Sequence, residues 1–146
     1  MGHTDDLLLG LALLHSASGV GTYSDTTGYT SGQTGIGLGK LPSGCDLAIA
    51  FTDYSVSDTN PDLAMTTIFI QALYRGTPDD RKSMTDLRDA SYDLLQNLPG
   101  RQVGAGHIDQ CFRVSTVPLG MDDENRWLQA DNYQIDLSLA PTATRQ

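Results

Sequence analysis

The side chains that could do chemistry are few in this sequence, and their spacing matches no catalytic or metal-binding pattern. The three histidines, His3, His15 and His107, lie far apart, and no two of them have the spacing of metal ligands. The two cysteines, Cys45 and Cys111, form no CxxC pair, so we expect two reduced thiols. We interpret these five residues as structural or surface groups.

The densest acidic cluster is Asp122-Asp123-Glu124-Asn125. It lacks the alternating oxygen ligands, the central glycine and the final glutamate of an EF-hand loop, so we interpret it as a solvated turn. A metal-dependent hydrolase that uses Asp122, Asp123 and His107 stays open as an alternative. That alternative requires the fold to bring residues together that are distant in sequence.

The glycine-rich run Gly35-x-Gly37-x-Gly39 is not a dinucleotide fingerprint, because its third glycine is misplaced and Leu41-Pro42 follows where a helix should begin. Neither Ser43 nor Cys45 has a nearby histidine to activate it. The sequence also has no GxSxG, HExxH or phosphate-binding loop motif. We therefore expect no catalytic residue, no metal site, no cofactor and no enzymatic activity.

Charge and length exclude several classes of protein. The chain has 146 residues and a formal charge of −9, from 17 Asp and one Glu against seven Arg and two Lys. A length of this order suits one domain, which we expect to span residues 1–146. Tight DNA binding needs Lys and Arg to neutralise phosphates, so the charge argues against it and against anionic lipid. The acidic start is unlike a signal peptide, which favours a soluble intracellular protein.

The elements that position these residues follow from hydrophobic spacing and from turn residues. We expect two helices, one from Thr4 to about Ala17 and one that begins at Thr77-Pro78 and ends before Pro99-Gly100. Strands are expected at 45–51, 63–75, 107–117 and 127–139, with a weak strand at 36–41. Loops are expected at 53–62 and 118–125, a Gly-rich loop or arm at 19–44, and a flexible tail at 140–146.

This order predicts the α+β class: a single domain with a mostly antiparallel sheet of about four to five strands, packed by the N-terminal helix and the central helix. The stretch 63–75 is apolar on both faces, so we expect a helix on one face and a neighbouring subunit on the other. Trp127 and Tyr133 share strand parity with Ile135 and Leu137, which favours a place in the core.

Several short motifs of the chain resemble one family. They are Tyr54-x-Val56-Ser57-Asp58, Tyr74-Arg75-Gly76, Asp93-Leu94-Leu95, Pro118-Leu119-Gly120-x-Asp122-Asp123-x-Asn125-Arg126-Trp127 and Asp131-Asn132-Tyr133. With the strand and helix order, this pattern resembles the minor capsid or tail terminator proteins of long-tailed bacteriophages, in particular those of actinobacterial hosts. The resemblance covers roughly residues 35–139. The chain departs from it at Gln129 and Ala130, where basic residues and Ser are usual, and at Asn125, where Gly is common.

The resemblance implies a structural virion protein that is made in the host cytoplasm and ends up in the neck of the tail. Such proteins form rings, typically hexamers, that cap the tail tube, stop its polymerisation and join it to the head. The implied partners are further copies of the chain, the tail tube protein and a head–tail connector or adaptor. DNA passes through the ring and is not specifically bound, and no membrane is involved.

The ring hypothesis yields two sets of candidate residues. For the subunit or tail-tube interface we select the turn near residues 119–126 together with the Gly-rich segment: Leu119, Gly120, Asp122, Asp123, Asn125, Arg126, Tyr29 and Ile36. For an acidic lumen that lets DNA slide we select Asp58, Asp62, Asp122 and Asp123. The alternative to the ring is a small non-viral binding or assembly module that recognises its partner with the Gly-rich segment.

Overall fold

The computed structural model describes residues 3–24, 28–60, 65–103 and 106–139, and for residues 3, 55–60 and 139 it describes the backbone alone. In this part of the chain, two helices, α1 (His3–Ala17) and α2 (Arg81–Gln96), accompany one seven-stranded sheet. The strands are β1 (Thr22–Tyr23), β2 (Gly35–Leu38), β3 (Ala48–Asn60), β4 (Met65–Pro78), β5 (Gln102–Val103), β6 (Gly106–Met121) and β7 (Arg126–Leu139).

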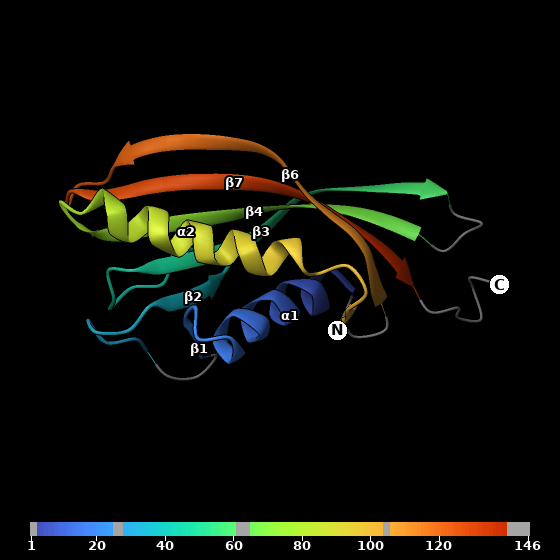
Figure 1. The fold of residues 1–146 in the computed structure, drawn as a ribbon, viewed down its shortest axis with the longest axis horizontal. Helices are drawn as coiled ribbons and strands as arrows, with labels where there is room; N and C mark the ends of the chain where they lie inside the picture. Colours follow the sequence, from blue (N-terminus) through green and yellow to red (C-terminus); the bar gives the residue numbers. More distant parts are fainter. Residues whose placement is uncertain (1–2, 25–27, 61–64, 104–105, 140–146) are drawn as a thin grey trace.

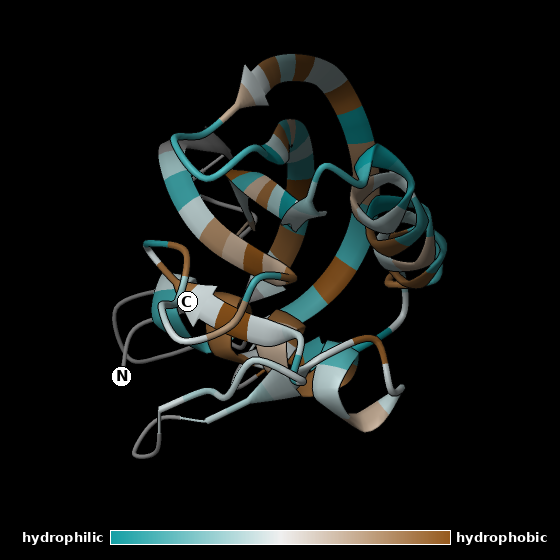
Figure 2. Ribbon diagram, turned by 90° about the vertical axis from the view of Figure 1, so that its left-hand side faces the viewer, coloured by the Kyte–Doolittle hydropathy of each residue, from teal (hydrophilic) through white to brown (hydrophobic). Residues whose placement is uncertain are grey.

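The sheet has the strand order β1-β2-β3-β4-β7-β6-β5. Strand β2 runs parallel to both β1 and β3, and every other neighbouring pair is antiparallel. The four long strands β3, β4, β7 and β6 lie side by side and dominate the molecule (Figure 1). Viewed from one end, the sheet bends round into an open arch (Figure 2).

The predicted sheet of four to five mostly antiparallel strands is therefore wrong. The sheet is mixed, has seven strands and curls into a half-barrel. Much of the predicted loop at 53–62 belongs to β3, which pairs Val56 with Ile68 and Ser57 with Thr67 of β4. Part of the predicted turn at 118–125 belongs to β6, which pairs Met121 with Trp127. Loops are expected there from the sequence because many of these residues are polar. Strand pairing, however, uses backbone groups and tolerates polar residues on an uncovered face.

Both helices pack on the same face of the sheet and enclose the core there. The face contributes buried side chains from alternate positions of β4 and β7, including Ile68, Ile70, Ile135 and Leu137. The helices contribute buried Leu7, Leu8, Leu11 and Ala12 from α1 and Met84, Leu87 and Leu95 from α2. Tyr133 is buried and Trp127 is half-buried against this core, as their strand parity predicts.

Helix α2 begins three residues later than the sequence suggests. Thr77 and Pro78 stay in β4, where Pro78 lies opposite Arg126. Asp79 then adopts a positive φ of 57° and turns the chain, and Asp80 becomes the N-cap. The Oδ1 atom of Asp80 accepts a hydrogen bond from the backbone N–H of Ser83 at 3.2 Å. The side chain of Asp80 satisfies a free N–H at the helix start, as an N-cap does.

Two short stretches of the Gly-rich segment at 19–44 join the sheet, as β1 and β2. Strands β1 and β2 extend the sheet beyond β3, and Ile36 of β2 is buried in the core. The hydroxyl of Tyr29 donates a hydrogen bond to the carbonyl of Ile36 at 2.7 Å. Gly35 is required where it stands, because a Cβ there would lie 2.7 Å from the sulfur of Cys45.

The described helices of the chain are too short or too polar to cross a membrane. The predicted tail at 140–146 lies outside the described residues.

Candidate functional site

The outer edge of β6 is the most distinctive surface of the molecule. Strand β6 pairs with β7 along its whole length, whereas β5 covers only its first two residues. Two further backbone bonds join Ile108 to Gly100 and Arg101. Beyond Ile108, as far as Met121, no other part of the described chain pairs with this edge. Unpaired backbone donors and acceptors in such a row form a template for another strand.

This free edge also carries most of the exposed apolar surface. Among the described residues, seven large apolar side chains are exposed, and five of them lie on β6: Phe112, Val114, Val117, Leu119 and Met121. Soluble proteins usually protect an exposed edge with Lys, Pro or a covering element. The stretch 110–121 contains no Lys, and its protection consists of Arg113, Pro118 and the bulges at Val114 and Leu119. An apolar, unpaired edge strand indicates an interaction surface.

Three irregularities shape this edge. The pairing of β6 with β7 shifts between Ile108 and Gln110, between Arg113 and Ser115, and between Pro118 and Gly120. The extra residues at these shifts are Asp109, Val114 and Leu119, spaced five residues apart. A bulge bends its strand and increases the local twist, which accounts for the curl of the sheet in Figure 2. The bulges also explain why Val114 and Leu119 do not follow a simple inward–outward alternation.

The sheet face opposite the helices carries Phe69, Leu73 and exposed Phe112 beside polar side chains that hydrogen-bond to one another. Thr67 donates to Asp136 at 2.7 Å, and Gln71 donates to Asn132 at 3.4 Å. Asn132 in turn donates to Ser115 of β6 at 2.9 Å. Its polar side chains present amide and hydroxyl groups rather than a dense field of carboxylates.

The turn between β6 and β7 is held by one arginine. Arg126 pairs with Asp122 at 2.9 Å, with Glu124 at 2.7 Å and with Asp46, in the segment before β3, at 3.2 Å. Burial raises the pKa of Asp122. Hydrogen bonds from the backbone N–H groups of Arg126 and Glu124, together with the Arg126 guanidinium, lower this pKa by more, so that it lies below its usual value. Asn125 takes a positive φ of 59°, a conformation that Asn tolerates in a turn.

The predicted interface residues lie at one end of the sheet. Leu119, Gly120, Asp123 and Asn125 are exposed, whereas Asp122 and Arg126 are half-buried in the ion-pair cluster. The structure brings this turn next to the Gly-rich segment, where a depression of about 220 Å³ is lined by Ser31, Gly44, Cys45, Asp46, Glu124 and Arg126. Tyr29 is half-buried beside this segment, and Ile36 is 1% exposed, so it belongs to the core of this chain.

Two of the four predicted lumen acids, Asp122 and Asp123, have described side chains, and both lie at the turn between β6 and β7. Asp122 is paired with Arg126, and Asp123 is exposed at the turn. Asp58 lies in β3, but its side chain is outside the described set, and Asp62 is outside the described residues. The acidic lumen therefore stays a prediction.

A buried group of polar side chains links the two helices. The hydroxyl of Ser91 on α2 lies 2.7 Å from Nε2 of His15 on α1, and the hydroxyl of Tyr74 donates to Ser91 at 2.8 Å. His15 Nδ1 faces the carbonyl of Leu11 at 2.7 Å, so Nδ1 carries the proton and Nε2 accepts from Ser91. A Ser–His pair can activate a nucleophile, but both residues are 0% exposed, and no substrate can reach them.

The residues of the hydrolase alternative are not brought together. His107 lies at the start of β6 and Asp122 follows its end, which places them roughly 45 Å apart along the strand. His107 pairs instead with Asp109 at 3.0 Å. Within the described ranges, no group of three or more His, Cys, Asp or Glu side chains could hold a metal ion. Burial, with a smaller effect of Asp136, raises the pKa of the Cys111 thiol to about 12, so the thiolate is scarce at neutral pH.

No protein-family model matches this sequence, and no curated protein matches it at a significant level. The function must therefore be inferred from the geometry of the chain itself.

Sequence reasoning missed the free edge of β6, although one signal was present. Val117, Leu119 and Met121 continue a period of two across Pro118, which favours a strand rather than a turn. Proline is typical of a strand end, but an edge strand tolerates it because the free side needs no N–H donor.

Proposed function

We propose that this protein is a structural subunit that assembles with further copies of itself into a ring through the free edge of β6. The observation that carries the proposal is the apolar, unpaired edge that follows Ile108 and ends at Met121. An edge of this kind gains both backbone hydrogen bonds and apolar burial when a second strand pairs with it. A ring results when such head-to-tail contacts close after a whole number of copies.

The specific role we propose is that of a tail terminator or neck ring in a long-tailed bacteriophage. In this role the ring caps the tail tube, stops its polymerisation and joins it to the connector of the head, and DNA passes through the centre. The turn between β6 and β7 is the proposed contact with the tube, since it projects at one end of the sheet (Figure 1) and carries exposed Asp123 and Asn125. The net charge of −9 is compatible with a channel that DNA traverses without being held.

The test is the mass of the protein in solution and the shape of the particle. We expect native mass spectrometry and negative-stain electron microscopy to show a closed ring with a central opening. A Val114→Lys variant should lose assembly, because it places a charge on the apolar edge. Leu13→Lys is the matched control: Leu13 is 51% exposed on α1 and Val114 is 50% exposed on β6. A stable monomer at all concentrations, or equal assembly of both variants, contradicts the proposal.

One observation favours the binding-module alternative. A depression of about 400 Å³ lies in the Gly-rich segment, lined by Tyr23, Ser24, Tyr29, Ile36, Gly37, Leu38, Lys40 and Pro42. Aromatic and glycine residues around an open pocket suit a peptide or a small ligand. A monomer that captures one specific ligand, and loses it on Lys40→Ala, would favour this function over the ring.

A further inference from the structure

We propose that the edge of β6 pairs with the edge of β3 in the next copy of the chain, with Arg113 of one copy facing Asp53 of its neighbour. This inference rests on the proposed ring function and goes beyond it by naming the second edge, the direction of pairing and the register. Its support comes from the two free edges of the sheet and from the residues that lie in the same row across it.

The second free edge lies on the opposite side of the sheet. Strand β2 pairs with β3 only along residues 48–51, from Ala48 to Phe51. One further bond joins the N–H of Gly39 to the carbonyl of Phe51 at 2.9 Å. From Thr52 to Asn60, β3 pairs with β4 on one side, and no other part of the described chain pairs with its other side. The sheet therefore has two unpaired edges, one on β6 and one on β3. They share rows where residues 52–57 of β3 lie level with residues 110–115 of β6, whereas the part of β3 level with residues 116–120 of β6 already pairs with β2.

The directions of these two edges suit each other. Strand β3 is antiparallel to β4, β4 to β7, and β7 to β6. Hence β3 and β6 run in opposite directions, and a neighbour placed in the same orientation offers its β3 antiparallel to β6. The helix-covered faces of both copies then lie on the same side of one continuous sheet. The contact is head-to-tail, which is the kind that builds a ring.

The residue rows define the register. Asp53 lies opposite Ile70, Ile70 opposite Tyr133, and Tyr133 opposite Arg113, so Asp53 and Arg113 stand at the two ends of one row. In a ring whose axis runs along the strands, rotation leaves the height of each row unchanged. Arg113, the last residue of the row in one copy, then lies level with Asp53, the first residue of the same row in the next copy. Arg113 and Asp53 are brought together with opposite charges.

The neighbouring row matches as well. Ser55, Phe69, Gln134 and Phe112 lie opposite one another across β3, β4, β7 and β6. Tyr54, the extra residue at the β3 irregularity, is exposed, and its ring centroid lies 6.0 Å from that of Phe69. Phe112 is exposed at the other end of the row. The proposed register therefore places Phe112 beside Tyr54 of the neighbour, and burial of two aromatic rings stabilises the contact.

Charges on the two edges are complementary. The stretch 110–121 of β6 contains Arg113 and no acidic residue. The stretch 52–60 of β3 contains Asp53 and Asp58 and no basic residue. Opposite charges on facing strands favour pairing, whereas a symmetric β6–β6 pair centred on residue 113 brings two arginines together.

Arg113 is poised for a second partner. Its guanidinium lies 3.9 Å from the ring centre of Tyr92 on α2, which orients the side chain. Its distance to Asp131 is 3.7 Å, longer than the 2.8 Å contact that Arg88 makes with the same carboxylate. Asp131 is thus already satisfied by Arg88, and Arg113 keeps donors for a carboxylate of a neighbouring copy. Asp53 is exposed.

Engineered cysteines test the register directly. We place Asp53→Cys and Arg113→Cys in one chain, with Cys111→Ser as background. Within a copy these positions are three strand spacings apart, about 14 Å, which is too far for a disulfide. We expect oxidation to give a ladder of cross-linked chains that ends at the size of the ring, whereas each single variant and the background give none.

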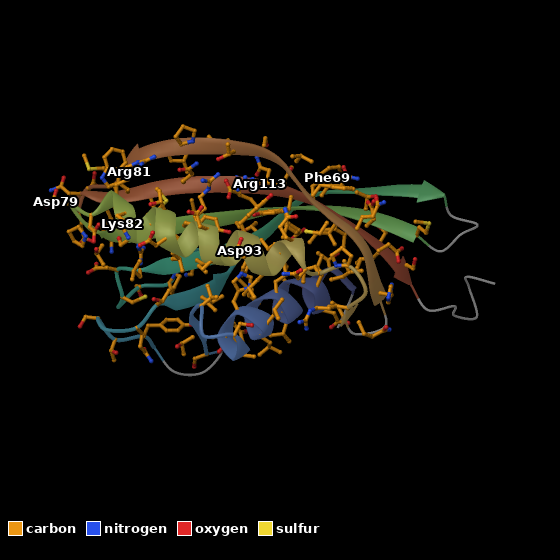
Figure 3. All side chains as sticks on the ribbon, viewed as in Figure 1. Phe69, Asp79, Arg81, Lys82, Asp93 and Arg113 are labelled. Carbon is orange, nitrogen blue, oxygen red and sulfur yellow. The ribbon has the colours of Figure 1, made fainter. Side chains whose placement is uncertain are left out.

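A charge variant tests the pairing without cysteines. Asp53→Lys places a lysine against Arg113 of the neighbour and should raise the concentration needed for half-assembly about tenfold or more. Asp93→Lys is the control, because Asp93 is exposed on α2 (Figure 3) and makes the same charge change. Thermal unfolding of both variants in dilute solution verifies that each folds.

The outcomes separate this inference from the proposed function. If the chain that carries both cysteine substitutions assembles but forms no cross-link between positions 53 and 113, the register is overturned and the ring proposal stays in place. Equal assembly of Asp53→Lys and Asp93→Lys likewise overturns the register and leaves the ring proposal in place. Cross-linking of the single Arg113→Cys variant to itself shows a symmetric β6–β6 dimer and overturns the head-to-tail contact. A native chain that never assembles overturns both.

Discussion

The hydroxyl of Ser91 lies 2.7 Å from Nε2 of His15, although the two residues are 76 positions apart in the chain. This contact joins α1 to α2 inside the core, where both side chains are fully buried. Tyr74 on β4 adds its own hydrogen bond to Ser91. The hydroxyl of Ser91 therefore connects both helices and the sheet, and the stability of the covered face depends on it.

Replacing Ser91 by alanine should destabilise the protein. The variant leaves Nε2 of His15 and the hydroxyl of Tyr74 buried without a partner, and an unsatisfied buried polar group costs about 1–3 kcal/mol. We expect the free energy of unfolding in urea to fall by about 2 kcal/mol or more. Ser31→Ala, at an exposed serine, should change it by less than about 0.5 kcal/mol. Equal effects of the two substitutions would refute the role given to Ser91.

Acidification should destabilise the fold through His15. Burial disfavours the charged ring and lowers the pKa of His15 below 6.5, and the hydrogen bond to Leu11 offsets only part of this. Below that pH the unfolded chain binds more protons than the folded one, so the free energy of unfolding falls as pH falls. The loss begins near pH 7 and reaches at most about 1.4 kcal/mol per pH unit.

Urea unfolding at pH 7.5 and pH 5.5 measures this loss. The native chain and the control His107→Gln should both lose stability between these values, because both keep the buried His15. His15→Gln should lose much less. If His15→Gln shows the same pH dependence as the native chain, the titrating group is elsewhere.

The helices and the core were the most predictable parts of the fold. The helical spacing of apolar residues from Leu7 to Leu14 and from Met84 to Leu98 predicts one buried face on each helix. Both stretches do lie against the core. Strand ends were less predictable. The polar residues that follow Phe51 suggest a loop, yet their backbone pairs with β4 as far as Asn60. Pairing of this kind depends on partners distant in sequence, which local composition does not report.

The candidate site was predictable only in part. The turn at Asp122 and Arg126 and its neighbourhood could be located from the acidic cluster and the following strand pattern. The edge of β6 could not, because being an edge is a property of the sheet order and not of the strand. The bulges at Val114 and Leu119 also interrupt the alternation on which strand prediction depends.

A buried hydroxyl without a partner should be dispensable. Among the described residues, the hydroxyls of Thr66 and Tyr133 are buried and neither makes a hydrogen bond of good geometry, although the hydroxyl of Tyr133 lies near that of Tyr74. Removal of such a group relieves its desolvation cost, so Tyr133→Phe and Thr66→Val should leave stability unchanged or raise it by up to about 1 kcal/mol. Tyr74→Phe, which removes the bond to Ser91, should instead lower it by about 1 kcal/mol. Denaturant unfolding of the three variants checks the contrast, and a large loss in Tyr133→Phe would show a missed partner.

The ion pair between Arg88 and Asp131 should be the most sensitive charged contact in the molecule. The Nε atom of Arg88 donates to both carboxylate oxygens of Asp131, at 3.0 and 2.8 Å, and Asp131 is 0% exposed. Arg88→Met leaves a buried carboxylate with only the longer contact to Arg113 at 3.7 Å. Removal of one partner from a buried pair costs about 3–5 kcal/mol.

Lys82→Met provides the matched control on the same helix. Lys82 pairs with Asp86 at 2.6 Å, but both side chains are largely exposed, so Lys82→Met should leave the free energy of unfolding nearly unchanged. The double variant Arg88→Met with Asp131→Leu should recover much of the stability, because no charge is then left buried without a partner. If the double variant is as unstable as Arg88→Met alone, the loss comes from packing of the arginine side chain rather than from the unpaired carboxylate.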